Sequence, residues 1–474
     1  MRISLLVVFV STHCLVACDG NGGSDAANHE PQIEHRSAGD ATVVDVTSNA
    51  FSAHSANMSE VSRIQKFNLG NDFFQNPWVA GSASTSSRDG LGGLFNNNAC
   101  QDCHIRDGRG HAPNVSATED GTDFSSALIR ATRSNISETD KNMMLQSLKA
   151  NVPDSSAGGQ LQHDAVAGVM KEVDLRVSYI DVEMQFADGH IETLRQPSWH
   201  ITNNYVSQGH AGFDQDTVFS VRTAPPMIGL GLLALIPETA IIAQEDPNDM
   251  DGDGISGRAN RVWSIEQQAV SLGRFGWKAG QPSLLEQSAG AFVNDMGLTS
   301  RLQPDENCMP HQVDCLATPN GNGDSVNSYD YEVSDAILDA VAFYAAHLAV
   351  PQRRDAYGAQ VQRGKALFQD AGCDQCHVAR YDTASSSAHP ELSEQSIFPY
   401  TDLLLHDMGE QLADFTLDNQ PVSDTVLVEF LANGREWRTP PLWGIGLTKA
   451  VDPHATFLHD GRARTVMEAV LWHG

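Results

Sequence analysis

The clearest hydrophobic pattern in the chain is a stripe at helical spacing between Glu332 and Val350. Apolar side chains recur there every three or four residues, and Pro351 cannot continue a helix. The stripe consists of Ile337, Val341, Tyr344 and Leu348. The pattern predicts a helix across this segment that ends before the proline.

Two more helices are predicted from their first residues. Ser283 and Thr465 each stand before a helix-like run, and each is followed three residues later by a glutamate, Glu286 and Glu468. A capping hydroxyl and a glutamate that reaches back form a capping box. Both helices are therefore expected to begin at these caps.

Residues 176–195 alternate between apolar and polar positions instead. Val182, Met184 and Phe186 share one face of an extended segment, and Ala187 to Gly189 supply a turn. The alternation predicts a β-hairpin set into a mainly helical frame.

Two copies of a Cys-x-x-Cys-His motif carry the candidate chemistry. In such a motif the two thiols add to the vinyl groups of a haem as thioethers, and the adjacent histidine binds the iron. The residues are Cys100, Cys103, His104, Cys373, Cys376 and His377. The sequence predicts two covalently bound c-type haems.

A redox dithiol or a zinc site is the alternative for an isolated Cys-x-x-Cys pair, but a zinc ribbon needs no histidine after each pair. The flanks of the two motifs also repeat, because Leu94-Phe95 and Leu367-Phe368 stand at matching offsets. Both features favour haem attachment.

Two further blocks recur in the same order after each motif. Residues 222–232 are similar to 438–447, where prolines forbid helix and glycines permit close backbone approach. Residues 275–286 are similar to 457–468. The repeats predict a mainly α fold of two duplicated c-type cytochrome domains with long loops and a small β-hairpin insertion in the first.

The N-terminus has the pattern of a bacterial export signal. The basic Met1-Arg2 precedes an apolar run from Ile3 to Val10, and residues 15–18 resemble a lipoprotein cleavage site that ends in Cys18. We expect a lipidated Cys18, a tether to the inner or outer membrane, and a periplasmic location. Ordinary secretory cleavage nearby is the alternative.

These features divide the chain into five expected segments. They are the lipoprotein signal peptide 1–18, a flexible linker 19–60, an N-terminal haem c domain with insertions 61–301, a connector 302–330, and a C-terminal haem c domain 331–474. The connector is rich in proline, asparagine and glycine.

Two of the eight cysteines belong neither to the signal nor to the haem motifs. These are Cys308 and Cys315, which are expected to form a disulfide outside the cytoplasm. A metal pair with His311 is the alternative.

The chain is strongly acidic, with 60 acidic against 30 basic residues and a formal charge of -30. This charge argues against nucleic acid as a partner and favours a basic redox protein. Solubility alone is the alternative explanation.

A second metal site is indicated by an acidic loop. Asp249, Asp251 and Asp253 alternate before a glycine, as in the first half of an EF-hand calcium loop, and Asn260 stands where the closing glutamate belongs. The sequence predicts calcium, with a plain acidic glycine-rich turn as the alternative.

The chain resembles the bacterial di-haem cytochrome c peroxidase superfamily, and more closely its di-haem oxidoreductase branch, often labelled thiol oxidoreductase or peroxidase. The resemblance covers roughly residues 60–474 and rests on the two haem motifs and on three blocks: residues 274–279, 404–409 and 457–462. It implies that hydrogen peroxide is reduced at the N-terminal haem, with electrons from a small redox protein entering through the C-terminal haem.

The resemblance gives Met408 a role, and the positions of His111 and Trp277 in the chain indicate roles for them. Met408 is the expected sixth ligand of the C-terminal haem, with His406 as the alternative. His111 is the candidate removable ligand of the N-terminal haem, or else a surface histidine. Trp277 is a candidate electron relay, or else plain core.

Peroxide cleavage needs a proton-transferring group, and the resemblance places it after the 275–286 block. Gln287 matches the family's glutamine, Asp295 replaces its glutamate in a shortened register, and Glu286 is the alternative. A different class of function is a non-enzymatic di-haem electron-transfer cytochrome, for example an accessory to iron acquisition in the cell envelope.

Overall fold

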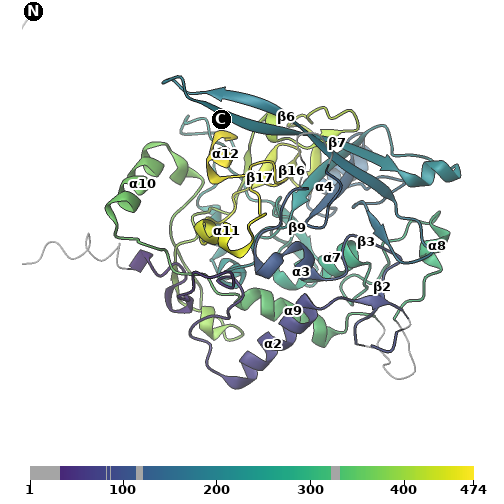
Figure 1. Ribbon diagram of the computed structural model, residues 1–474, viewed down its shortest axis with the longest axis horizontal. Coiled ribbons are helices and arrows are strands. Elements are labelled where there is room, and N and C mark those ends of the chain that lie inside the picture. Colours follow the sequence, from purple (N-terminus) through teal and green to yellow (C-terminus); the bar gives the residue numbers. More distant parts are fainter. Residues whose placement is uncertain (1–32, 82, 86, 114–120, 322–330, 474) are drawn as a thin grey trace, which may run out of the picture.

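The computed structural model describes residues 33–81, 83–85, 87–113, 121–321 and 331–473 (Figure 1). The expected signal peptide, the lipidated Cys18 and parts of the 19–60 and 302–330 segments lie outside the described residues. Within them, every helix is too short or too polar to cross a membrane.

Helices make up 27% of the structure and strands 22%, so the expectation of a mainly α fold is wrong. Most of the sheets are pairs of strands only two to four residues long. An alternating hydrophobic pattern needs about four to eight residues to be recognised, so most of these strands leave no periodic signal in the sequence.

The elements are distributed along the whole chain. The α-helices are α2 (Val61–Gln75), α3 (Cys100–Cys103), α4 (Glu138–Leu145), α5 (Leu230–Ala234), α6 (Glu238–Ile242), α7 (Leu284–Met296), α8 (Val313–Leu316), α9 (Asp335–His347), α10 (Ala359–Asp370), α11 (Thr448–Val451) and α12 (Val466–Leu471). The strands up to the connector are β1 (Val79–Ala80), β2 (Asp89–Leu91), β3 (Leu94–Phe95), β4 (Ala127–Arg133), β5 (Asp164–Ala165), β6 (Val173–Gln185), β7 (Ile191–Asn203), β8 (Thr217–Thr223), β9 (Arg261–Ser264) and β10 (Ala269–Leu272). Those after it are β11 (Tyr381–Asp382), β12 (Ser396–Ile397), β13 (Leu405–Asp407), β14 (Phe415–Thr416), β15 (Leu427–Glu429), β16 (Ala432–Asn433) and β17 (Glu436–Arg438).

The predicted hairpin is confirmed and is longer than expected. Strands β6 and β7 pair in unbroken antiparallel register from Val173 and Asn203 to Gln185 and Ile191. The turn lies at residues 186–190, where the sequence placed it. The two strands extend along one side of the molecule (Figure 1).

The predicted helix after the connector is also confirmed, as α9. It begins at a Ser334 cap, whose hydroxyl accepts from the N–H of Ile337, and ends before Pro351. It packs closely on α2, because a β-carbon at Gly70 would lie 2.1 Å from the Ala340 carbonyl. Only glycine permits this approach of two backbones, which brings an N-terminal helix against one from beyond the connector.

The predicted caps Ser283 and Thr465 are confirmed at the starts of α7 and α12. The block before each cap also folds in the same way in both copies. A β-bridge joins Phe275 to Gln281 in the first copy and Phe457 to Ala463 in the second. The internal repeat is therefore visible in the backbone.

The two copies are interleaved. Strand β14 joins the sheet begun by β4 and β8, where Phe415 pairs with Phe219. The repeated blocks also exchange hydrogen bonds, because Thr223 N–H donates to the His459 carbonyl at 2.7 Å and Arg438 N–H donates to the Trp277 carbonyl at 2.8 Å. The proposed division at residues 302–330 stays a prediction, but packing does not stop there.

Candidate haem sites

The first motif forms a single helical turn, α3, that ends in His104. The N–H of His104 donates to the Cys100 carbonyl at 2.9 Å, and its ring Nδ1 donates to the Pro225 carbonyl at 2.9 Å. Because a carbonyl oxygen only accepts, Nδ1 carries the proton and Nε2 is the ring nitrogen that can bind iron.

The second motif has the same local geometry. The N–H of His377 donates to the Cys373 carbonyl at 3.0 Å, and its Nδ1 donates to the Tyr400 carbonyl at 2.9 Å. The ring of Phe368 lies 6.1 Å from the imidazole. Each histidine is thus held through Nδ1 by a backbone carbonyl, an arrangement typical of histidines that bind metal through Nε2.

A cavity of about 450 Å³ lies beside the second motif. Phe368 and Tyr400, the two neighbours of His377, line it together with residues of the repeated block: Leu442, Trp443, Ile445 and Leu447. Arg353, Arg354 and Lys365 also line it, and Glu34 pairs with Arg353 and Lys365 there. Cations of this kind also pair with the carboxylates of a haem. Its size lies in the usual range of about 300–1,000 Å³ for cofactor sites. These residues fit a haem bound to His377.

The first motif also faces an interior space. Surrounding protein raises the pKa of the Cys100 thiol to about 12 and lowers that of His104 to about 4, yet both side chains keep accessible surface. Burial likewise dominates the pKa of Cys103, Asp295 and Arg130, and these residues too are only partly covered. Side chains that are enclosed by protein and still keep accessible surface border an internal hollow. The two thiols and the adjacent histidine of the motif border this hollow, and they fit a haem bound there.

The sheet of β4 and β8 forms one wall of this hollow. Alternate residues Ile129 and Val221 lie in the apolar core on one face. Arg130 and Arg222 project from the other face, because side chains alternate across a strand. Two guanidinium groups therefore reach toward the hollow from neighbouring strands.

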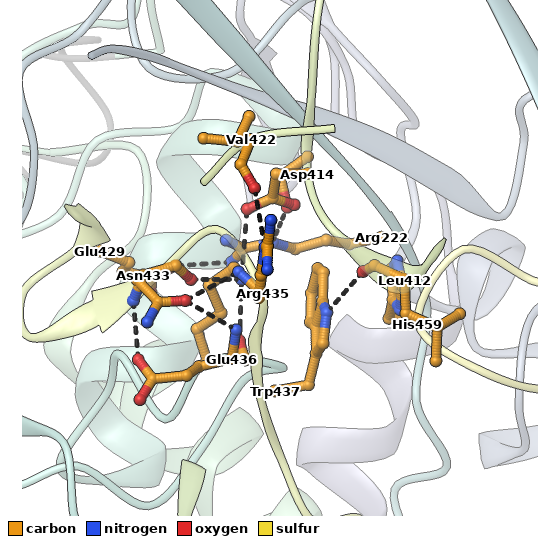
Figure 2. Close-up of polar contacts among 12 residues, drawn as sticks. Arg222, Leu412, Asp414, Val422, Glu429, Asn433, Arg435, Glu436, Trp437 and His459 are labelled. Carbon is orange, nitrogen blue, oxygen red and sulfur yellow. Dashed lines mark hydrogen bonds and ion pairs between the residues drawn. The ribbon is translucent and has the colours of Figure 1, made fainter. Parts of the chain in front are cut away.

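Glu429 meets these arginines from β15. Its carboxylate contacts the Arg222 guanidinium at 2.6 Å (Figure 2). Burial acts to raise the pKa of Glu429, but the charges of Arg222 and Arg130 outweigh it and hold that pKa below its usual value. The charges of Glu429 and Asp295 both act on the pKa of Arg130, so the three groups belong to one charged cluster.

A buried aromatic and charged stack lies next to this cluster. Lys278 is fully buried, with Nζ 3.2 Å from the Asp414 carboxylate and 3.6 Å from the centre of the Trp437 ring. The His459 ring stacks on Trp437 at 3.6 Å, as Figure 2 shows. Lys278 and His459 come from opposite copies of the repeated block, so the stack joins the two halves.

The three candidates for proton transfer lie in different surroundings. Asp295 lies closest to the attachment cysteines, since its charge raises the pKa of both thiols, and its Oδ1 accepts from Gln160 at 2.7 Å. Glu286 is buried and accepts from the Ser264 hydroxyl at 2.6 Å and the Ile265 N–H at 2.9 Å, which gives it a structural role. Gln287 is half-buried on α7 near Gly276.

The candidate sixth ligands are also separated. Met408 packs in an apolar cluster that includes Ile445, a residue that lines the second cavity. His406 contacts the Asp402 carboxylate at 2.7 Å and the Cys376 sulfur at 3.5 Å. Burial works to lower the pKa of His406, but hydrogen bonding to Asp402 and Cys376 prevails and raises it to about 10. The Nδ1 atom of His406 also lies 2.9 Å from the Ser256 carbonyl, so both ring nitrogens already have partners. This arrangement leaves neither nitrogen for iron and favours Met408.

Two more residues are predicted to act at the first site, His111 as a removable ligand and Trp277 as an electron relay. His111 is half-buried, with its ring 6.3 Å from that of His454. Trp277 is buried and donates from Nε1 to the Thr223 carbonyl at 2.7 Å. Its carbonyl binds Arg438 of the second repeat, so Trp277 bridges the two halves as a relay would need to.

The acidic loop is rearranged relative to the EF-hand expectation. Asp249 and Asp251 gather with Asp246, with one oxygen from each within 4.8 Å of the others. Asp253 instead accepts from Gln375 of the second haem motif at 2.5 Å. Asn260 is buried and donates to the Lys278 carbonyl at 2.8 Å, so it is unable to close the loop.

The predicted disulfide between Cys308 and Cys315 is confirmed. Because both sulfurs are bonded, the alternative metal pair with His311 is excluded. The His311 ring instead packs edge-on against Tyr205, 5.3 Å away.

Two histidine-bearing Cys-x-x-Cys turns, each beside an internal space in one interleaved fold, are the signature of a di-haem protein. A family model described as "Di-haem oxidoreductase, putative peroxidase" matches residues 32–474, and the chain belongs to this family. No curated protein and no solved structure matches the chain.

Sequence reasoning missed Arg130, Arg222 and Glu429. Arg222 opens a repeated block and could have been singled out for that reason. Glu429 carries no motif, and its two arginine partners lie more than 200 residues away in the chain. Only the folded structure brings them together.

Proposed function

We propose that the chain is an exported di-haem c-type peroxidase that reduces hydrogen peroxide to water. The proposal rests chiefly on the two matching Cys-x-x-Cys-His turns, each with its histidine held through Nδ1. Covalent attachment is assigned to Cys100 and Cys103 in the first site and to Cys373 and Cys376 in the second. His104 and His377 are then the proximal ligands.

The two sites have different tasks in this proposal. A haem bound in the first hollow would supply the iron at which peroxide binds and the electrons that cleave it. The chain's own contribution there is a set of buried charged groups that can hold and move protons. Each peroxide consumes two protons and two electrons and gives two molecules of water.

Electrons enter through the second site, where Met408 is the proposed sixth ligand because a thioether raises the haem potential. The donor is a small redox protein, and the chain's formal charge of -30 favours a basic one. Cleavage before Cys18 and lipidation would keep the protein tethered in the periplasm.

Calcium is a further part of the proposal. Asp246, Asp249 and Asp251 supply hard oxygen ligands, and their loop reaches the second haem motif through Asp253 and Gln375. An ion there would rigidify the loop beside that haem.

The decisive experiment mixes half-reduced holoprotein with hydrogen peroxide in a stopped-flow spectrometer. Rapid reoxidation of the haems, with two electrons used for each peroxide, supports the peroxidase. A protein that stays reduced and whose two haems both remain six-coordinate supports the electron-transfer cytochrome instead.

A further inference from the structure

The charged cluster of the first site contains a carboxylate that lies outside the block that resembles the family. It is Glu429, which lies more than 130 residues further along the chain than that block. The inference rests on the proposed function and adds a residue to it.

The position of Glu429 is fixed from several directions. Its backbone carbonyl accepts from the buried Asn260 amide at 3.2 Å, and the same Asn260 accepts from the Leu431 N–H at 3.1 Å. The N–H of Phe430 donates to the Ala150 carbonyl at 2.6 Å. The hairpin tip that carries the carboxylate belongs to the second half and is thus held by two segments of the first half.

The carboxylate also has a space made for it. A β-carbon added at Gly280 would lie 1.6 Å from the Glu429 Oε1 atom, so the carboxylate occupies the place of a side chain in the repeated block. The backbone of Gly280 does not require glycine by its conformation. The close approach of Glu429 is therefore the physical reason for glycine at this position.

The charges around Glu429 suit a base that is ionised at neutral pH. Arg222 contacts it at 2.6 Å, and Arg130 and Lys278 add positive charge nearby. The Glu429 side chain keeps 19% of its surface accessible and contacts Arg222, which projects from the sheet face that borders the hollow. Asp295, by contrast, stands beside the sulfurs, at the edge where the thioethers form.

We infer that Glu429 is the acid–base group of the first haem site, positioned by Arg222 and Arg130. As a carboxylate it takes the proton from the peroxide oxygen that binds the iron. It then gives that proton to the far oxygen, which leaves as water when the O–O bond breaks. Because that proton comes from the peroxide itself, two electrons from the donor protein and two protons from solvent are still needed to turn the remaining oxygen atom into the second molecule of water.

The test uses ligand binding rather than turnover. Hydrogen cyanide must lose a proton when it binds an oxidised haem, whereas imidazole binds as a neutral molecule. Glu429→Gln should slow cyanide association about 100-fold, the scale of general-base assistance, and should leave imidazole association unchanged within about 2-fold. Signals are assigned to the first haem by their absence from Cys103→Ser protein.

Two more variants complete the comparison. Gly280→Ala keeps every charge but displaces the Glu429 carboxylate. Cyanide association should therefore slow by about 10-fold, a smaller loss than that expected for Glu429→Gln. Glu183→Gln, an exposed change on β6 with the same chemistry, should change neither rate. Should Glu429→Gln lose its haem, Gly280→Ala decides the question by the same ratio of rates.

The assignment is overturned if a haem-loaded Glu429→Gln protein binds cyanide as fast as the wild type. It is equally overturned if cyanide and imidazole slow together, since that result means a blocked pocket and not a lost base. A third outcome separates the two proposals. If the wild type does not react with peroxide but Glu429→Gln slows cyanide and not imidazole association, the proposed peroxidase function is overturned. Glu429 then still stands as the proton acceptor of the first haem site.

Discussion

The two haem sites share an attachment turn and differ in what surrounds it. Around the first, the charged side chains of Asp295, Arg130 and Glu429 are enclosed within the protein. Around the second, aromatic and aliphatic side chains such as Phe368 and Trp443 line the cavity. A duplicated unit has thus kept its means of holding a haem and changed the surroundings. Enclosed charged groups lie at the first site, whereas at the second an aromatic and aliphatic wall stands beside Arg353 and Lys365, which pair with Glu34.

The largest effect expected is the loss of one haem at a time. Cys103→Ser and Cys376→Ser should each remove about one of the two haems, because each thioether pair holds its own porphyrin. A pyridine haemochrome assay of purified protein gives the content. Wild-type protein that loses its haem to acidified acetone would contradict covalent attachment at both sites.

The next effect tests the charged contact between the halves. Lys278→Met should lower the free energy of unfolding by about 3–5 kcal/mol, because it leaves the buried Asp414 carboxylate without its cation. Denaturant titration of the holoprotein measures the change, and Asp414→Asn in the same protein should restore part of it. The control Lys141→Met changes an exposed lysine, and its free energy of unfolding should stay within about 0.5 kcal/mol of the wild-type value.

A smaller effect is expected on the difference between the reduction potentials of the two haems. Met408→His should lower the potential of the second haem on the order of 0.1 V, since axial ligands tune haem potentials over roughly 0.8 V. The half-reduced state should then disappear from a redox titration, and the exposed change Met467→His should leave it intact. Two haems of equal potential in the wild type would refute the division of labour.

The smallest effect concerns the acidic loop beside the second site. Chelation of calcium should lower the free energy of unfolding by about 2 kcal/mol, as expected for a ligand present well above its Kd. Asp251→Ala should abolish that response, whereas the exposed Asp424→Ala should not. Identical melting curves with and without chelator in the wild type would mean that the loop holds no ion.

The sequence was informative wherever the signal was local. The motif at residues 100–104, the cap at Ser283 and the hairpin turn at residues 186–190 each involve a few adjacent residues, and the structure has the turns, the cap and the hairpin. The fold class failed because most strands are too short to show alternation.

The site residues divide in the same way. The two Cys-x-x-Cys-His motifs could be recognised because thioether attachment requires fixed spacing, and the attachment itself stays a prediction. The buried cluster could not, because Glu429 meets Arg222 only after strands from both halves have assembled. Likewise Asp246 was overlooked as a companion of Asp249, since the EF-hand pattern begins at the later residue.

The interleaving of the halves bears on how such a protein matures. The Arg195 side chain donates to the Arg462 carbonyl across 267 residues of chain, and β14 completes a sheet begun by β4. Contacts this distant form slowly, and they have to wait until the last part of the polypeptide has been delivered. In the exported, covalently loaded protein that we propose, both cysteine pairs would therefore remain on open chain until the last strands are delivered, within reach of the haems to be attached.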